Sequence, residues 1–510
     1  MGFAQILSRA EQGLTAPLVR VEVHLGSGLP TFNIVGLAAP VVRESRERVR
    51  AALAHCGFAF PAGRITVNLA PADLPKEGGR FDLPIALGIL VASNQVRPDC
   101  DLQVTEFYGE LGLTGELKSV AGLLLAALHA ARDGHSLVVP RVDLPQLRIV
   151  EGCTLRGIGH LAELAGLDGS PVAGSGPCAG ESGESPGHDP PRCAAPSLDL
   201  SDVRGQWQAR RALLIAAAGG HALLMCGPPG SGKSMLAQRL PGLLPALSRE
   251  ESLEVAAIAA VARTAAPVAG QGAARPFRAP HHTASAHAIV GGGVAVRPGE
   301  VSLAHHGVLF LDELPEFDRR VLEALREPLE SGLVSVVRAN QRAQYPARFQ
   351  LVAAMNPCPC GRAGQVRPRC ECPAPKVQHY RARISGPLLD RIDLQLTLPV
   401  VEAQAIDDAA PAAEALTTAQ ARELVCAARA RQQQRQGCCN ARLGPAETLL
   451  HCRAEPAGMQ LLRLAVEKQG HSARAQHRIL RVARSIADLD SRDAVIANDV
   501  AEALAMRWER

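Results

Sequence analysis

The sequence predicts an α/β protein with two globular parts, a linker between them and a helical carboxyl-terminal segment. Segments typical of strands alternate with segments typical of helices before residue 170 and again after residue 197. Between them, SPVAGSGPCAGESGESPGHDPPRCAAPS is rich in Pro, Gly and Ser and has almost no large apolar residues, so it cannot bury a core. After about residue 402 the pattern becomes mostly helical. We therefore expect domains at 1–169, 198–402 and 403–510, with a flexible linker at 170–197.

Composition excludes several classes of protein. The 510 residues are too many for one core, and a formal net charge of only +4 means that any site for a polyanion must be a local patch. Fourteen unevenly spaced cysteines, and a first segment without the features of a secretory leader, indicate a reducing cytoplasm. The longest apolar runs, such as residues 121–131, are far shorter than the ~20 residues that cross a bilayer, so no membrane span is expected.

The clearest motif is LLMCGPPGSGKS at residues 223–234. An apolar run, a glycine-rich turn with the spacing G-x-x-x-x-G-K-S and a helical segment follow one another, an order that points backbone N–H groups at a phosphate. Lys233 is expected to reach the β- and γ-phosphates of ATP, and Ser234 to bind Mg²⁺. The nucleotide-binding candidates are Gly227, Pro228, Pro229, Gly230, Ser231, Gly232, Lys233 and Ser234. The alternative is a glycine-rich turn that matches the spacing by chance.

Two later strands end on the polar groups that such a loop needs. GVLFLDEL ends in two carboxylates, of which Asp312 is expected to complete the Mg²⁺ shell and Glu313 to polarise the attacking water. LVAAMN ends on Asn356, a neutral polar group placed to orient that water. With the phosphate loop, these residues predict a site for ATP and Mg²⁺.

Two arginines complete the catalytic candidates. Arg391 in SGPLLDRID lies just past the predicted core, and Arg474 in HSARAQHRIL lies in the helical segment. One cation from a neighbouring subunit and one from a helical lid would stabilise charge on the γ-phosphate. The alternative for each arginine is a solvated helix face.

Longer sequence words indicate a family. RPFRAPHHTASAHAIVGGG, RPGEVSLAHHGVLFLDELPEF, AAMNPCPCG and ISGPLLDRID make residues 200–510 resemble the magnesium chelatase subunits of the AAA+ ATPases. The resemblance implies an AAA+ P-loop core with a helical lid, an insert near residues 276–293 and a hairpin near residues 333–349. It also implies a ring, usually a hexamer, in which Arg391 acts in trans.

The amino-terminal part resembles a narrower group. GLPTFNIVGLAAPVVRESRERVRAAL and RITVNLAPADLPKEGGRFDLPIALGILVAS are similar to the first half of the YifB/ComM proteins, a domain of the Lon-proteolytic and ribosomal S5 domain 2-like type. Together the two resemblances cover nearly the whole chain, except for the linker. The YifB/ComM resemblance implies ATP-driven branch migration of DNA during natural transformation.

Proteolysis is not expected of this Lon-like domain. Aligned with the Lon pattern P-K-D-G-P-S-A, PKEGGRFD places Arg80 where the nucleophilic serine would stand, and Ala126 matches the position of the general-base lysine. A hydroxyl nucleophile needs an adjacent base, and both residues are missing. We expect a scaffold or a collar that faces DNA, with Lys76 and Arg80 either as DNA contacts or as part of a solvated turn.

Four cysteines lie together in CPCGRAGQVRPRCEC. Cys358, Cys360, Cys370 and Cys372 form two C-x-C pairs separated by nine residues, and four thiolates can close a tetrahedral Zn²⁺ site. The C-x-C spacing is tighter than the more common C-x-x-C. Two alternatives stay open, a Zn²⁺ site and four reduced thiols in a mobile loop.

The segment LVSVVRANQRAQYPARF predicts a β-hairpin with Asn340 and Gln341 at its turn. Related rings point this hairpin into the pore, where Arg338 and Arg342 would contact DNA phosphates. The alternative is an exposed hairpin whose arginines only aid solubility.

These features predict a cytoplasmic ring ATPase, a hexamer by resemblance, that uses ATP and Mg²⁺ to move single-stranded or branched DNA as a helicase-like branch migration motor. The alternative is a chelatase-type or chaperone-like ATPase that remodels a protein and needs no nucleic acid. Stimulation of ATP hydrolysis by DNA would favour the first, and stimulation by a partner protein would favour the second.

Overall fold

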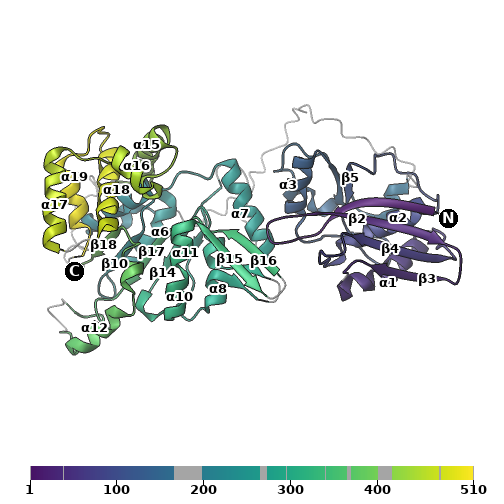
Figure 1. Ribbon diagram of the computed structural model, residues 1–510, viewed down its shortest axis with the longest axis horizontal. Coiled ribbons are helices and arrows are strands. Elements are labelled where there is room, and N and C mark those ends of the chain that lie inside the picture. Colours follow the sequence, from purple (N-terminus) through teal and green to yellow (C-terminus); the bar gives the residue numbers. More distant parts are fainter. Residues whose placement is uncertain are drawn as a thin grey trace. The chain divides into compact units, whose positions relative to one another are not determined.

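The structure of the protein, a computed structural model, describes residues 2–37, 39–165, 198–264, 273–293, 296–338, 341–363, 369–399, 416–469 and 472–508. It divides into two compact units (Figure 1). The first unit comprises residues 1–192 and 256–270, and the second comprises residues 193–255 and 271–510. The predicted linker at 170–197 and the predicted boundary at residues 402 and 403 lie outside the described residues.

The first unit contains a seven-stranded mixed sheet with the order β3-β4-β2-β1-β5-β8-β9. Its strands are β1 (Gly2–Arg9), β2 (Leu18–Gly26), β3 (Thr31–Val35), β4 (Arg64–Ala70), β5 (Thr105–Phe107), β8 (Ser136–Pro140) and β9 (Leu155–Ile158). β1, β2 and β4 pair antiparallel, whereas β5, β8 and β9 extend the sheet from β1 in parallel. A short hairpin and four helices complete the unit: β6 (Glu110–Leu111), β7 (Leu117–Lys118), α1 (Pro40–His55), α2 (Asp82–Ala92), α3 (Leu123–Asp133) and α4 (Leu144–Leu147).

Both faces of this sheet are covered, because alternate side chains along β8 belong to two different cores. Val138 belongs to the core that includes α2, whereas Leu137 and Val139 belong to the core that includes α3 and α4. The α2 sequence, DLPIALGILVA, is apolar almost all round, and the helix is buried against β1 and β2.

The expectation for Lys76 and Arg80 is wrong in both its forms. Lys76 is fully buried and its Nζ donates to the Pro71 carbonyl oxygen, and burial lowers the pKa of Lys76. Arg80 is 6% exposed and donates to Glu11 Oε2 at 3.0 Å and to the Ala121 carbonyl oxygen at 2.7 Å. Both side chains are buried and hydrogen-bonded within the unit, so neither lies in a solvated turn or is exposed to DNA.

The second unit is built on a five-stranded parallel sheet with the order β11-β14-β17-β10-β18. Its strands are β10 (Leu223–Cys226), β11 (Phe277–Arg278), β14 (Val308–Leu311), β17 (Gln350–Met355) and β18 (Leu394–Thr397). All residues of β10, β14 and β17 are buried, as expected for parallel strands that are covered by helices on both faces. The helices before and after β10 are α5 (Trp207–Gly219) and α6 (Lys233–Leu243). They are followed by α7 (Arg249–Ala262), whose residues from 256 onward are assigned to the first unit.

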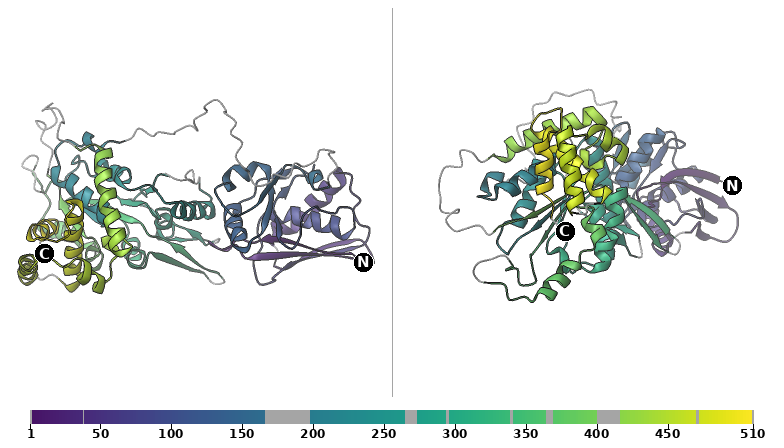
Figure 2. Two further views of the ribbon diagram at one scale, coloured as in Figure 1. Left: turned by 90° about the horizontal axis from the view of Figure 1, so that it is seen from above. Right: turned by 60° about the vertical axis from the view of Figure 1, so that its left-hand side comes forward.

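Shorter elements connect the strands of this sheet. They are α8 (Ala286–Val290), β12 (Gly291–Gly292), β13 (Arg297–Pro298), α9 (Glu300–Leu303), α10 (Arg319–Ala324), α11 (Arg326–Ser331), β15 (Leu333–Arg338), β16 (Gln341–Pro346), α12 (Ala374–Ala382) and α13 (Gly386–Leu389). The carboxyl-terminal helices are α15 (Thr418–Gln436), α16 (Pro445–His451), α17 (Pro456–Gln469), α18 (Ala473–Leu489) and α19 (Ala497–Ala505), and Figure 2 shows them gathered as one bundle, coloured yellow-green to yellow.

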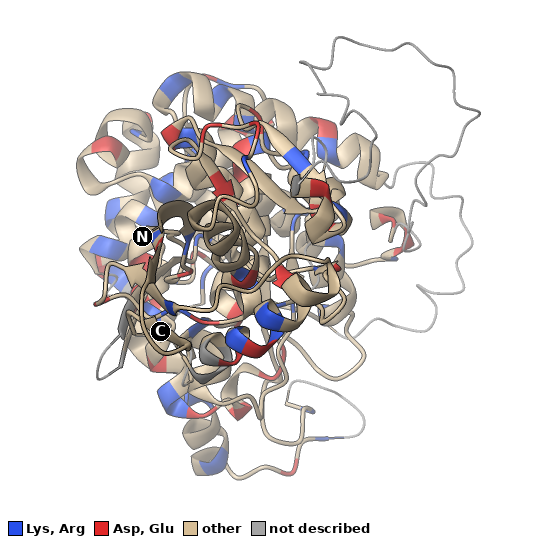
Figure 3. Cartoon of the chain, turned by 90° about the vertical axis from the view of Figure 1, so that its right-hand side faces the viewer, with Lys and Arg blue, Asp and Glu red and all other residues tan. Residues whose placement is uncertain are grey.

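The predicted fold class, α/β with a P-loop type of parallel sheet, is confirmed. Basic and acidic residues are intermixed along the described chain, in keeping with the small net charge (Figure 3). Of the helices described, not one combines the length and the apolar character that crossing a membrane requires.

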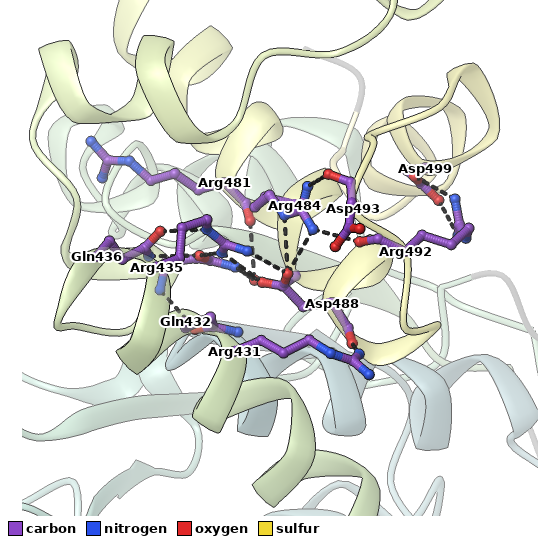
Figure 4. Close-up of polar contacts among 12 residues, drawn as sticks. Arg431, Gln432, Arg435, Gln436, Arg481, Arg484, Asp488, Arg492, Asp493 and Asp499 are labelled. Atoms are coloured by element: carbon purple, nitrogen blue, oxygen red, sulfur yellow. Dashed lines mark hydrogen bonds and ion pairs between the residues drawn. The ribbon is translucent and has the colours of Figure 1, made fainter.

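A fully buried carboxylate, Asp488, joins α15 to α18 within the helical bundle (Figure 4). Arg435 of α15 binds both of its oxygens at 2.8 and 2.9 Å, and Arg484 of α18 donates to Oδ1 at 2.8 and 3.0 Å. Asn440 donates to Oδ2 at 2.9 Å. Burial would raise the pKa of Asp488, but the hydrogen bonds from Arg435 and Arg484 outweigh it, so the pKa is lowered.

We expect Asp488→Asn to lower the free energy of unfolding by about 3 kcal/mol, because it leaves buried arginines without their counter-charge. Trp207 and Trp508 both belong to the second unit, so tryptophan fluorescence during denaturant unfolding reports on it. The control is Asp490→Asn, whose partly exposed carboxylate pairs at the surface and should contribute less than about 1 kcal/mol.

The same carboxylate predicts a pH dependence. Because the pKa of Asp488 is lower in the folded than in the unfolded chain, its stabilisation is complete above the unfolded value of about 3.9 and disappears as the pH falls below it. The difference in stability between the parent and Asp488→Asn should therefore shrink in acid, and a difference that stays constant from pH 7 to acid would contradict the assignment.

Candidate nucleotide-binding site

The phosphate loop, residues 227–232, joins the end of β10 to the start of α6 at the carboxyl edge of the parallel sheet. The strand order reverses at β10, and such a reversal is where open α/β sheets bind ligands. Gly230 and Gly232 have φ angles of 80° and 85°, a left-handed conformation that glycine adopts without strain. A Cβ on Gly227 would lie 2.7 Å from Ser231 Oγ, so the loop has no room for a larger residue there.

Lys233, the first residue of α6, lies inside this loop and is only 9% exposed. Its Nζ donates to the carbonyl oxygens of Gly227 at 2.6 Å and Pro228 at 2.9 Å, and to Asn356 Oδ1 at 3.3 Å. Burial lowers the pKa of Lys233, while the nearby Asp312 carboxylate opposes that shift. The structure thus brings Asn356, at the end of β17, to the phosphate loop as the sequence predicts.

Ser234 and Asp312 form a direct pair across the sheet edge. Ser234 Oγ donates to Asp312 Oδ2 at 2.8 Å, and hydroxyl and carboxylate oxygens are ligands that Mg²⁺ accepts. Ser231 Oγ is buried and has no hydrogen-bond partner among the described residues, so a phosphate oxygen would satisfy it. This set of donors and oxygen ligands fits a nucleotide that carries Mg²⁺.

Glu313 lies at the rim of a pocket of about 320 Å³ beside this pair. The pocket is lined by Ser234, Gln238, Phe277, Ala279, Pro280, His281, His282, Phe310, Asp312 and Glu313. The Glu313 backbone is left-handed, with φ of 51°, a conformation that costs a non-glycine residue ~1 kcal/mol. Its side chain is 50% exposed, which leaves the carboxylate accessible to water.

The sequence reasoning missed His282. Its Nδ1 lies 3.3 Å from Glu313 Oε2, and its ring meets the Phe317 ring edge-on. The imidazole therefore lies beside the Glu313 carboxylate and lines the same pocket. The available signal was its position just after β11, since that strand pairs in parallel with β14 and both end at the same edge.

The two candidate arginines, Arg391 and Arg474, both lie near Glu330 of α11. Arg391 is 9% exposed, pairs with Glu330 Oε1 through Nη2, and donates through Nη1 to the Pro387 carbonyl oxygen at 2.7 Å. Arg474 Nη1 lies 4.0 Å from the same Glu330 oxygen, and its side chain is 77% exposed. Among the described residues, neither arginine has a hydrogen bond or ion pair with the phosphate loop.

The helix α18 carries Arg474 and is fixed to the sheet by Asp393. Arg478 Nη1 donates to Asp393 Oδ1 at 2.6 Å and to the Arg391 carbonyl oxygen at 2.8 Å. His221 Nδ1 lies 3.3 Å from the other oxygen of Asp393. Burial would raise the pKa of Asp393, but Arg478 and His221 hold it well below its usual range. This buried ion pair brings Arg474, one helical turn earlier, close to Arg391.

The four predicted cysteines converge. The sulfur atoms of Cys358, Cys360, Cys370 and Cys372 all lie within 4.8 Å of one another. They belong to the segment that leaves β17 directly after Asn356.

The hairpin β15–β16 forms where it was predicted, but Gln341, which was predicted for the turn, is the first residue of β16. Arg338 pairs with Gln341, so Gln341 belongs to the strand and residues 339 and 340 connect the two strands. Arg342 pairs with Val337 on the adjacent rung. Asn340 and the side chains of Arg338 and Arg342 lie outside the described residues, so their contact with DNA stays a prediction.

Comparison of the sequence with known proteins shows the family of the chain. The family description "Magnesium chelatase, subunit ChlI" matches residues 199–406, "Subunit ChlI of Mg-chelatase" matches residues 21–143, and "Magnesium chelatase, subunit ChlI C-terminal" matches residues 415–507. The magnesium-chelatase 38 kDa subunit of Cereibacter sphaeroides is 25% identical over 33% of this chain and 54% of its own length.

Two relatives match over almost their full length. Competence protein ComM of Haemophilus influenzae is 45% identical over 99% of this chain and 98% of its own length, and YifB of Escherichia coli is 45% identical over 99% and 97%. The chain belongs to the YifB/ComM family of magnesium chelatase-like AAA+ proteins.

Proposed function

We propose that the protein is a ring-forming AAA+ ATPase that couples hydrolysis of Mg²⁺-bound ATP to branch migration of DNA during natural transformation. The observation that carries the proposal is the convergence of Lys233, the Ser234–Asp312 pair, Glu313 and Asn356 on one edge of one sheet. Similarity over nearly the full chain to a protein named for competence supports the role in transformation.

In this proposal each residue of the sheet edge has one task. Lys233 and the loop N–H groups bind the β- and γ-phosphates, and Ser234 and Asp312 hold Mg²⁺, which when bound neutralises charge on the phosphate oxygens. The exposed carboxylate of Glu313 accepts a proton from the attacking water, and Asn356 orients that water.

The proposed roles of Arg391, Arg474 and the separate domains depend on a ring of subunits. Arg391 acts on the nucleotide of a neighbouring copy, and Arg474 acts from the lid, once Glu330 releases them. A ring, hexameric by family resemblance, supplies that neighbour. Residues 198–402 form the core, 403–510 the lid and 1–169 a non-proteolytic collar, joined by the linker, and the ring works on single-stranded or branched DNA in the cytoplasm.

The function is tested with the purified chain in two assays, ATP hydrolysis with and without forked DNA, and three-strand exchange. We expect DNA to stimulate hydrolysis and ATP to drive exchange. Lys233→Ala should lose nucleotide binding, because the cation inside the phosphate loop is gone. Glu313→Gln should still bind ATP but hydrolyse it about 100-fold more slowly, because only proton transfer is lost. Lys468→Ala, which changes an exposed lysine of α17, is the control.

Some results would redirect the proposal. Hydrolysis that ignores DNA but rises with a partner protein would favour a protein-remodelling ATPase. A Glu313→Gln protein that hydrolyses ATP at the parental rate would reject the role given to this residue.

The hairpin is tested by Arg338→Ala with Arg342→Ala. If both arginines contact phosphates, DNA affinity should fall, and the slope of its logarithm against the logarithm of salt concentration should become shallower by about 1 per lost contact. Basal ATP hydrolysis should be kept, because the hairpin is separate from the phosphate loop. Arg422→Ala with Arg463→Ala, two exposed arginines on α15 and α17, is the matched control. Unchanged affinity and slope would remove the hairpin from the DNA path.

Action in trans predicts complementation between inactive subunits. Arg391→Ala and Lys233→Ala should each abolish ATP hydrolysis alone, and mixing them should restore part of it. A mixed interface can pair an intact phosphate loop with an intact Arg391 from the next subunit. Mixtures that form rings but stay inactive at every ratio would show that Arg391 does not act across the interface.

A further inference from the structure

The segment that leaves β17 gathers four cysteine thiols into one small cluster beside the nucleotide site. The sulfur of Cys358 lies 3.3 Å from that of Cys360 and 3.5 Å from that of Cys370, and the latter two are 3.5 Å apart. Cys372 completes a group in which every sulfur lies within 4.8 Å of the others. All four are free thiols, and their separations are far longer than the ~2.05 Å of a disulfide bond.

These separations suit a tetrahedral metal site. Four sulfurs at the usual Zn–S distance of about 2.3 Å lie about 3.8 Å from one another. The three separations of 3.3, 3.5 and 3.5 Å are slightly shorter than this value. Thiolates select Zn²⁺ over Mg²⁺, which prefers oxygen ligands. A structural zinc site takes four protein ligands and leaves no open position. The cluster supplies four sulfurs, which is the required number.

The backbone around the sulfurs supports thiolates. The N–H of Ala363 donates to Cys358 Sγ at 3.3 Å, and the N–H of Cys372 donates to Cys370 Sγ at 3.4 Å. Hydrogen bonds from outside the ligand shell orient metal-bound sulfurs and stabilise their negative charge. The surrounding sequence, residues 357–383, carries six Lys and Arg against a single Glu, which offsets the net charge of −2 that four thiolates on Zn²⁺ would bring.

The cluster lies directly against the candidate nucleotide site. A Cβ added to Gly361, between the two pairs of cysteines, would lie 2.7 Å from the Pro229 side chain in the phosphate loop and 3.8 Å from Asn356. Arg381 of α12 donates to the Pro357 carbonyl oxygen at 3.1 and 3.2 Å. The turn after Asn356 is therefore packed between the phosphate loop and α12, and its own shape depends on what holds the four sulfurs together.

We propose that the four thiolates bind one Zn²⁺ ion, and that this ion fixes the turn after Asn356 against the phosphate loop. On binding, each thiol loses its proton to solvent and no electron is transferred, so the site needs no oxidant or reductant. The ion is structural, and it acts on the nucleotide only by positioning Asn356 and Pro229. The positioning part rests on the proposed ATPase function, whereas the presence of zinc does not.

The first test measures metal in the full chain, purified under reducing conditions without a metal-binding tag. Elemental analysis should find about one zinc per chain, and blocking the thiols with an organomercurial should release it. In Cys360→Ser with Cys370→Ser the zinc content should fall about tenfold or more. Cys438→Ser, a change to a free thiol outside the cluster, should keep the full content.

A second measurement covers the case in which the double variant does not fold. The parent protein, exchanged into Co²⁺, should show the absorption bands of a tetrahedral cobalt–thiolate centre. Less than about a tenth of a zinc per chain, with no uptake from added Zn²⁺ and no cobalt bands, would overturn the proposal. Disulfides among these cysteines in protein kept reduced throughout would overturn it as well.

The positioning role has its own readout. In a folded double variant, judged by unchanged tryptophan emission, we expect weaker binding of a fluorescent ATP analogue and a several-fold lower kcat. If nucleotide binding and kcat are unchanged while zinc is lost, the ion does not position Asn356. If zinc is present but no variant of the chain hydrolyses ATP, the proposed ATPase function fails and the zinc site stands.

Discussion

The strand order of the five-stranded parallel sheet is the constraint on which the candidate site depends. Because β10 lies between β17 and β18, and β14 lies on the far side of β17, the carboxyl ends of three strands open onto one edge. Lys233, Asp312 and Asn356 follow those ends and are therefore close together, although 123 residues separate Lys233 from Asn356. The short apolar strands are buried on both faces, so the edge cannot shift without exposing the core.

Buried carboxylates connect the helical segment to this sheet and also join two helices within that segment. Asp393, next to β18, binds Arg478 of α18, and Asp488 binds arginines from α15 and α18. A buried carboxylate needs partners that offset the cost of removing it from water, and the arginines beside both groups lower the pKa despite burial. The contact of Arg478 with Asp393 also helps to place Arg474, one helical turn earlier on α18.

In the first unit, the two positions compared with the Lon pattern are taken up by internal contacts. Arg80 stands at the position of the nucleophilic serine in the Lon pattern, and here it donates to Glu11 and Ala121. Ala126, at the position of the lysine, is a buried residue of α3 that faces the core. Arg80 therefore serves internal hydrogen bonding and Ala126 serves packing.

The sequence by itself determined the fold class, the phosphate loop, the acidic strand end, Asn356 and the cysteine spacing. Each of these is a local pattern whose chemistry follows from residue type and order along the chain. Burial and long-range pairing were decided only by the tertiary structure. Lys76 and Arg80 look like exposed cations in a turn, and only the packing around them reveals their internal partners. The contacts of His282 with Glu313, and of Arg391 with Glu330, join segments 31 and 61 residues apart, and no local pattern specifies which side chains meet across such a distance.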